Sequence, residues 1–192
     1  MRIIPFKVNN EVFSMSRLAI PAVLAVAAGL GLPLVAFAAD PAATVNKVTA
    51  DGTGVEAGTV RVIKTKDGAA FNLNLKDLPP GPHGIHIHEK GDCGPATVNG
   101  NIVPSGAAGG HWDDAHTGKH EGPAGQGHMG DLPLLIVEAD GTVTKTLLAP
   151  RIADIEAVRG HAIVIHAGGD NYSDQPAALG GGGARIACGV IK

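Results

Sequence analysis

The histidines of this 192-residue sequence are concentrated in one part of the chain. All nine lie between His83 and His166, and Asp131 follows His128 by three residues. Imidazole is the commonest protein ligand for copper and zinc, and one aspartate among imidazoles suits zinc. Packing alone does not call for so many imidazoles in so short a span. The pattern therefore predicts a metal centre.

Two of these histidines, His86 and His88, are separated by one residue in a segment that alternates like a strand. Side chains at positions i and i+2 of a strand point to the same face, so both rings could bind one metal ion. His166 ends another expected strand and could add a third nitrogen. A rigid set of three or four nitrogen donors suits copper. The spacing of His86 and His88 by itself has only modest specificity.

A second set of candidate ligands lies in residues 90–131, which have no regular periodicity. It comprises His111, His120, His128 and Asp131. Three imidazoles and one carboxylate match a four-coordinate zinc site. A loop of this length is uncommon unless it has a function, and a bound metal would tie it down.

Short strands must position these side chains. Residues 70–75 alternate cleanly, with Phe71, Leu73 and Leu75 on one face, and residues 66–68 (Lys-Asp-Gly) predict a hairpin turn before them. We expect residues 40–50 to be a lead-in and residues 153–159 to form one or two helical turns. The fold class predicted is all-β: a Greek-key antiparallel barrel or sandwich of about eight strands, with long functional loops at 90–131 and 168–183. The other expected strands are 59–65, 83–89, 134–138, 142–148, 161–166 and 184–191.

The N-terminal residues 1–39 are expected to be a signal peptide. Basic Arg2, Lys7 and Arg17 precede an uncharged apolar stretch that ends in small residues around Phe37. Starting at Met15 gives a cleaner signal, so we expect Met15 to be the true start. The alternative is an uncleaved anchor, because the stretch is long enough to span a bilayer.

The remaining domain, residues 40–192, is mildly acidic. It has 12 Lys and Arg against 17 Asp and Glu, a net charge of −5. A basic run that could follow phosphates is missing, which argues against nucleic acid as a partner. We expect no membrane contact by the mature domain, and export predicts a periplasmic location.

Cys93 and Cys188 are the only cysteines. In an exported protein two cysteines predict one disulfide. Closing a loop of about 100 residues would stabilise the fold by about 4–5 kcal/mol in the chain-entropy model. Two buried free thiols are the alternative.

Taken together, these segments resemble the copper/zinc superoxide dismutases, in particular the exported bacterial type. The likeness covers almost all of residues 45–192, and the candidate ligands, the cysteines and Arg185 occur in the order of the family. The matching segments are GIHIHE (84–89), GDC (91–93), GH (110–111), TGKHEGP (117–123), GHMGDLP (127–133), HAGGDNY (166–172) and GARIACGVI (183–191).

The resemblance implies dismutation of the superoxide anion to oxygen and hydrogen peroxide, with redox-cycling copper and structural zinc as cofactors. It implies catalytic roles for His111, which exchanges a proton, and Arg185, which holds the anion. Asp170 would join a copper histidine to a zinc histidine, and Cys93 would pair with Cys188. Homodimers are common in this family. The implied copper ligands are His86, His88, His111 and His166, and the implied zinc ligands are His111, His120, His128 and Asp131.

Two other functions fit the sequence less well. A metal-binding protein without activity would lack a copper ligand or Arg185, and all are present. A two-metal hydrolase would need more bridging carboxylates and a nearby general base. His83, His116 and His161 match no ligand position. Trp112 is expected either at a subunit contact or as a cap of the loop against the barrel.

Overall fold

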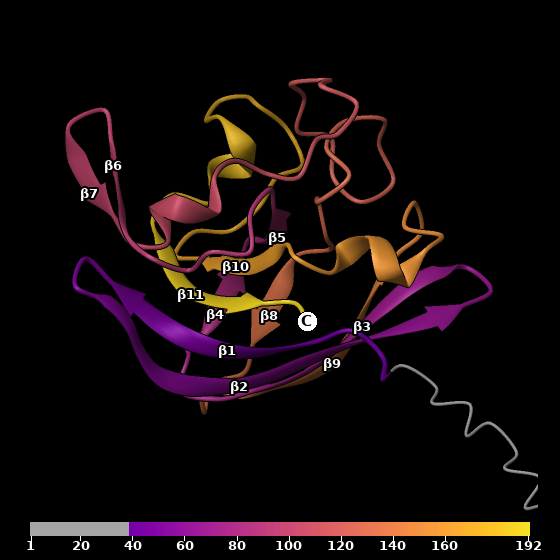
Figure 1. Cartoon of the computed structure of the whole chain (residues 1–192), viewed down its shortest axis with the longest axis horizontal. Coiled ribbons are helices and arrows are strands. Elements are labelled where there is room, and N and C mark those ends of the chain that lie inside the picture. The colour runs from indigo at the N-terminus through magenta and orange to yellow at the C-terminus, as the bar shows by residue number, and fades with distance from the viewer. Residues whose placement is uncertain (1–38) are drawn as a thin grey trace, which may run out of the picture. The chain divides into compact units, whose positions relative to one another are not determined.

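The computed structural model describes residues 39–192, which fold into an all-β domain (Figure 1). A seven-stranded antiparallel sheet has the order β5-β10-β11-β1-β2-β3-β9, and β4–β8 and β6–β7 form two smaller sheets. The expected all-β antiparallel class is confirmed. The strands are β1 (Ala42–Thr49), β2 (Gly52–Thr65), β3 (Gly68–Leu75), β4 (Gly81–His83), β5 (Ile85–His88), β6 (Ala96–Val98), β7 (Asn101–Val103), β8 (Leu135–Val137), β9 (Val143–Ala149), β10 (Ala162–His166) and β11 (Arg185–Val190).

The long hairpin of β2 and β3 forms where the alternation is cleanest. Phe71, Leu73 and Leu75 are buried on one face, as their spacing predicts. The turn is closed by the hydroxyl of Thr65, which donates to the carbonyl of Gly68 at 2.7 Å. Gly68 has a φ of +120°, and a Cβ there would lie 2.4 Å from the carbonyl oxygen of Ala149 in β9. Only glycine lets β9 approach this turn so closely.

Residues 40–50 are a strand and not the expected lead-in. β1 pairs with both β2 and β11, so it lies inside the sheet. Its pairing with β2 is irregular between Val45 and Val48, where the register shifts. Val45 packs in the main core, whereas Val48 packs with Val164 and Cys188 on the opposite face of the sheet, which is why two valines three positions apart are both buried.

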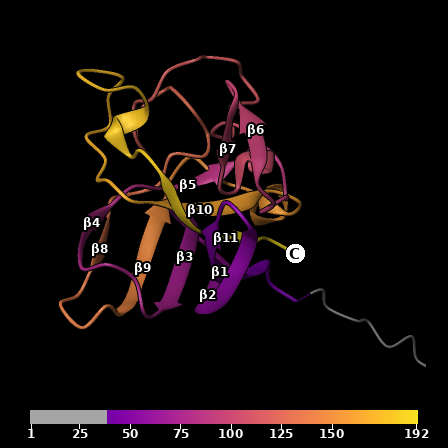
Figure 2. The same cartoon turned by 90° about the vertical axis from the view of Figure 1, so that its left-hand side faces the viewer.

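The sheet curls so that β5, β10 and β11 lie above the long β2–β3–β9 segment, with the core between them (Figures 1 and 2). Ile85 and Ile87 of β5 and Ile163 and Ile165 of β10 point into this core. All residues of β5 and β10 are buried, because the long loops cover their outer face. That outer face carries the histidines.

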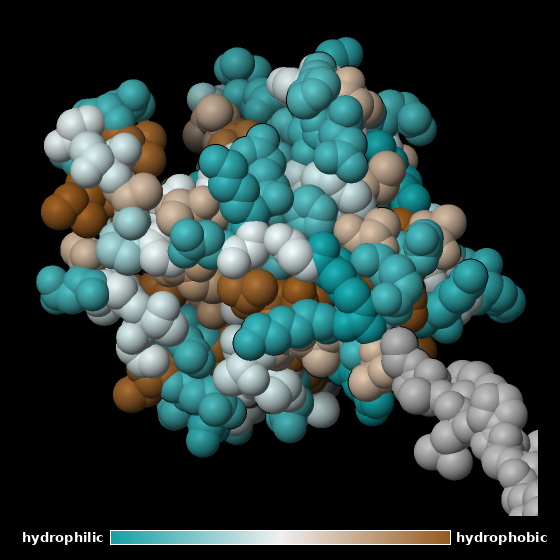
Figure 3. Space-filling model, in the orientation of Figure 1, coloured by the Kyte–Doolittle hydropathy of each residue, from teal (hydrophilic) through white to brown (hydrophobic). Residues whose placement is uncertain are grey.

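Three short 3-10 helices complete the fold: η1 (Gly106–Ala108), η2 (Ile155–Val158) and η3 (Leu179–Gly181). η2 confirms the helical turn expected at 153–159. The long loop 90–131 also contains the hairpin of β6 and β7, which projects from the domain and was not expected (Figure 1). Its Val98 and Ile102 are exposed, and brown marks this corner of the surface (Figure 3). Side chains exposed on a short hairpin leave no core-facing periodicity to detect.

The expected disulfide is formed. Cys93 and Cys188 are bonded with an S–S distance of 1.98 Å, and they join the loop to β11. The proposed signal segment lies almost entirely outside the described residues. Within residues 39–192 there is no helix with the length and apolar character needed to cross a membrane.

Candidate metal centre

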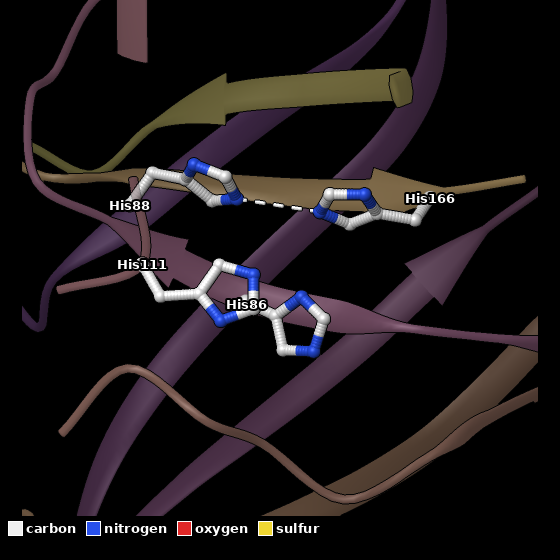
Figure 4. A group of neighbouring side chains, drawn as sticks. All are labelled: His86, His88, His111 and His166. Carbon is white, nitrogen blue, oxygen red and sulfur yellow. Dashed lines mark hydrogen bonds between the residues drawn. The ribbon is translucent and has the colours of Figure 1, made fainter. Parts of the chain in front are cut away.

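Adjacent strands position the first three histidines. His86 and His88 lie on β5, opposite Val164 and Ala162 of β10, and His166 ends β10 at a register shift. The Nε2 atoms of His88 and His166 are 3.3 Å apart. With His111 they form a buried group whose ligand atoms all lie within 4.8 Å of one another (Figure 4). The strand spacing therefore brings together what the sequence predicted.

The fourth ring, His111, comes from the long loop. A β-bridge sets His111 beside His88, and another sets Asp131 beside His86, so the loop is paired to β5 at both places. The His111 ring stacks on His86 with centroids 3.9 Å apart. His111 Nδ1 donates to Asp131 Oδ1 at 3.2 Å, while its Nε2 has no hydrogen-bond partner. His111 thus belongs to two groups of candidate ligands.

The second group is His86, His111, His120 and Asp131, again within 4.8 Å of one another. The sequence placed His128 in this group instead of His86. His128 is close but stands slightly apart: its Nδ1 is 3.5 Å from Asp131 Oδ1, against 3.0 Å for His120 Nδ1. Asp131 is therefore the point on which the three loop histidines converge.

Asp170 connects the two groups. Its Oδ2 accepts a hydrogen bond from His86 Nε2 at 2.8 Å, and its Oδ1 accepts one from His120 Nε2 at 2.7 Å. The backbone N–H of Tyr172 also donates to Oδ1. Because each ring uses its outer nitrogen on Asp170, its Nδ1 is left to face the interior of the centre.

The unpartnered nitrogens test whether this arrangement fits metal ions. Buried polar atoms in proteins nearly always have a hydrogen-bond partner. Among the described residues six buried side-chain atoms have none, and four of them are ring nitrogens of this centre. The four atoms are His86 Nδ1, His111 Nε2, His120 Nδ1 and His128 Nδ1. Such nitrogens, clustered beside a carboxylate, fit cations that accept lone pairs.

Electrostatics keep most of the ligands ready to bind. Burial, followed by the charge of His86, lowers the pKa of His166 to about 3. Burial also lowers the pKa of His111 to about 4, although Asp131 acts in the opposite direction. For His88, burial and then the charge of His111 lower the pKa well below its ordinary value. These three rings are neutral near pH 7, the form that binds metals.

His120 differs from the other rings. Burial is the largest single influence and lowers its pKa, but the two neighbouring carboxylates, Asp131 and Asp170, outweigh it and raise the pKa to about 9. For both carboxyls burial is also the largest influence and raises the pKa, yet the hydrogen bonds from their histidine partners hold the pKa far below its usual range.

Arg185 reaches the outer face of the centre from β11. Its guanidinium donates to the carbonyls of Ser105 and, at 2.6 Å, Gly109. Its positive charge helps to lower the pKa of His88 and of His166, as expected for a cation beside the first group.

Ser105, whose carbonyl holds Arg185, is completely buried with a φ of +51°, and its hydroxyl donates to the carbonyl of Cys93 at 3.4 Å. Sequence reasoning missed Ser105, because it acts through its carbonyl.

Two of the unassigned histidines support the ligands. His83 is buried, with Nδ1 2.7 Å from the carbonyl oxygen of His166 and Nε2 2.8 Å from that of Pro79. His161 Nδ1 lies 3.0 Å from the carbonyl oxygen of His88. His116 is exposed, in a turn with a φ of +51°.

Trp112 belongs to the core and stacks on His161, with ring centroids 4.6 Å apart. Its backbone N–H donates to Ile87 at 2.8 Å, and its carbonyl accepts from Gly130. Trp112 was expected either at a subunit contact or as a cap of the loop. Only 6% of the residue is exposed, which agrees with the cap.

Comparisons with known proteins agree with this geometry. The family model described as copper/zinc superoxide dismutase (SODC) matches residues 56–191. Superoxide dismutase [Cu-Zn] 2 of Salmonella typhimurium is 54% identical over 82% of this chain and 91% of its own length, and superoxide dismutase [Cu-Zn] of Escherichia coli K12 is 51% identical with the same coverage. The solved structure of the Brucella abortus enzyme, 46% identical, matches with a TM-score of 0.77 over 79% of this chain and 98% of that one. The solution structure of the monomeric Salmonella enterica enzyme, 54% identical, gives 0.71 over 80% and 100%.

Proposed function

Because this chain belongs to the copper/zinc superoxide dismutase family and dismutes superoxide to oxygen and hydrogen peroxide, we propose how its residues divide this work. His86 and His111 both belong to the two groups of ligands, but His86 commits its Nε2 to Asp170, whereas His111 has Nδ1 beside Asp131 and an Nε2 without a hydrogen-bond partner, and this difference carries the proposal. His111 is the shared ligand. The copper ligands are His86, His88, His111 and His166, and the zinc ligands are His111, His120, His128 and Asp131.

When bound, copper supplies the one-electron redox chemistry, and zinc, which has none, supplies charge and rigidity. The chain supplies position and protons. With zinc bound, His111 would take up a proton from water at Nε2, the nitrogen without a partner in the protein, and would deliver it to the reduced substrate. Water supplies the second proton, so two superoxide anions and two protons give one oxygen and one hydrogen peroxide.

Arg185 binds the anionic substrate. Residues 40–192 have a net charge of −5, so attraction must come from local positive charge. The guanidinium is held in place by two carbonyls and is only partly buried, which leaves it able to contact a small anion. Residues 167–184 contain no Lys or Arg, so steering by that loop is not part of the proposal.

We also propose that the protein is exported to the periplasm, with residues 1–39 as its signal peptide. The disulfide between Cys93 and Cys188 supports an oxidising compartment. The family resemblance favours a homodimer, whereas the Salmonella enterica relative is described as monomeric. The molar mass of purified residues 40–192 in solution decides between them.

Superoxide decay measured with two preparations tests the proposed roles. Protein loaded with copper and zinc should accelerate the decay, and protein loaded with zinc alone should not. Metal analysis should find one copper and one zinc per chain, and His111→Ala should alter the visible absorption of the bound copper. Full activity in the zinc-only protein, or an unaltered copper spectrum in H111A, would contradict the proposal.

A further inference from the structure

The segment 117–131, which carries His120, His128 and Asp131 and is called the zinc loop below, is held on one side by a residue outside both long loops. Arg151 donates from Nη1 to the carbonyl of His128 and from Nη2 to the carbonyl of Gly127, both at 3.0 Å. No side chain of the described residues other than Arg151 hydrogen-bonds these two carbonyls. Arginine suits this task, because its planar guanidinium presents two N–H groups in a fixed geometry.

The backbone around Arg151 presents the side chain rigidly. Arg151 lies between β9 and η2, and the next residue, Ile152, is buried in the core. The N–H of Ile152 donates to the carbonyl of Ala149 at 3.2 Å, which closes a tight turn. The backbone of Arg151 is therefore fixed to the core, while its guanidinium hydrogen-bonds to the loop.

His128 is the ligand that most needs such support. It stands outside the 4.8 Å group, and its Nδ1 is buried without a partner. Its backbone N–H donates to the carbonyl of Lys119 at 2.9 Å, which ties it to the segment of His120. Arg151 restrains the backbone carbonyl of the same residue, His128. The position of the ring then depends on both restraints.

We propose that Arg151 is a positioning residue of the zinc site, which sets the distance of His128 from Asp131 by holding the carbonyls of Gly127 and His128. The inference rests on the proposed function, since His128 is assigned there as a zinc ligand. Partners that hold metal ligands in place contribute roughly 10-fold to 100-fold to metal affinity. Arg151 acts on zinc in particular, because both of these hydrogen bonds reach the zinc loop.

The experiment measures zinc and copper dissociation constants by competition with chelators, together with the visible absorption of protein carrying Co²⁺ in the zinc site. Arg151→Ala should weaken zinc binding roughly 10-fold to 100-fold and alter the Co²⁺ bands, with copper binding unchanged. Arg151→Lys should fall between R151A and the unmodified protein, because an ammonium lacks the two-pronged geometry.

Arg159→Ala is the matched control. Arg159 follows η2 and pairs with Glu156 in an exposed ion pair, so its loss removes an arginine from the same region without touching the zinc loop. Equal zinc affinity in R151A and R159A overturns the inference, as does an equal loss of copper and zinc affinity in R151A. If R151A does not fold, R151K decides by the same criteria. Failure of the unmodified protein to bind zinc would instead refute the proposed ligand set.

Discussion

At the level of single residues, the centre depends on how the second nitrogen of each ring is fixed. His88 Nδ1 donates to the carbonyl of Gly109 at 3.0 Å, and His166 Nδ1 lies 3.2 Å from the carbonyl oxygen of Gly183. Asp170 fixes the outer nitrogen of His86 in the same way. A ring whose outer nitrogen donates is held in one tautomer and orientation, with the inner nitrogen free for a metal.

The sequence predicted the histidines that converge in the centre better than the groups that support them. His86 and His88 are recognisable because a strand spacing and an imidazole leave a clear pattern. Ser105 and Arg151 act on or through backbone carbonyls, which every residue has, so their types and spacing carry no signal. Asp174 is similar: it accepts from the backbone N–H of His120 at 2.9 Å, a contact between distant loops.

Replacing Arg185 with alanine should lower kcat/KM for superoxide. Local positive charge raises association rates by about 10-fold to 1,000-fold, and the rest of residues 40–192 is acidic. Pulse radiolysis at several ionic strengths should show a loss of roughly 10-fold or more and a weaker salt dependence. Arg185→Lys, which keeps the charge, should retain more of the rate. Unchanged kinetics in R185A would remove Arg185 from the mechanism.

Zinc uptake should release a proton from His120. The pKa of His120 in the metal-free protein is raised to about 9, so the ring is protonated at pH 7 and must become neutral to bind zinc. His111, with its pKa lowered to about 4, is already neutral and releases none. Zinc affinity should therefore increase with pH up to about 9. Titration calorimetry in buffers of different ionisation enthalpy measures this, and zero proton release at pH 7 would contradict it.

At the level of elements, prediction succeeded where one face of a strand is buried. β3 alternates cleanly and was expected within two residues of its bounds. β1 was missed because Val45 and Val48 are buried on opposite faces of the strand, which hides the two-residue period, and β6 and β7 were missed because a projecting hairpin has little buried face. Regular alternation is thus visible in a sequence, whereas burial on both faces of a strand depends on what packs against it.

Removal of the disulfide should weaken the connection between the long loop and β11. The bond spans 95 positions, and a loop of that length contributes about 4–5 kcal/mol in the chain-entropy model. Cys93→Ser with Cys188→Ser should lower the free energy of unfolding by up to this amount in urea titrations. Activity should also fall, since Ser105 and hence Arg185 are held beside Cys93. A doubly substituted protein with unchanged stability and activity would refute both expectations.

At the level of the whole molecule, two parts of different character meet. The curled sheet encloses a continuous apolar core, while the loops 90–131 and 167–184 meet through polar contacts such as those of Asp170 and Asp174. Metal binding therefore adds most where apolar packing is least. The division predicts that the two parts respond differently to metal removal.

Chelation should loosen the loops and leave the sheet intact. A ligand at about 1,000 times its Kd stabilises the folded state by about 4.1 kcal/mol, so metal-free protein should have a lower Tm. Amide hydrogen exchange should accelerate in residues 111–131 and 167–184, with β2 and β3 unchanged, because local opening requires only the loss of loop contacts. Equal acceleration in β3 would show that the barrel depends on the metals as well.

The place of β11 in the sheet has a consequence for biosynthesis. β11 is the last strand along the chain, yet it lies between β1 and β10. Until the ribosome has made it, β1 and β10 present open edges, and Arg185 and Cys188 do not exist. A nascent chain can therefore neither join the two halves of its sheet nor place Arg185 beside the metal centre before β11 has been made.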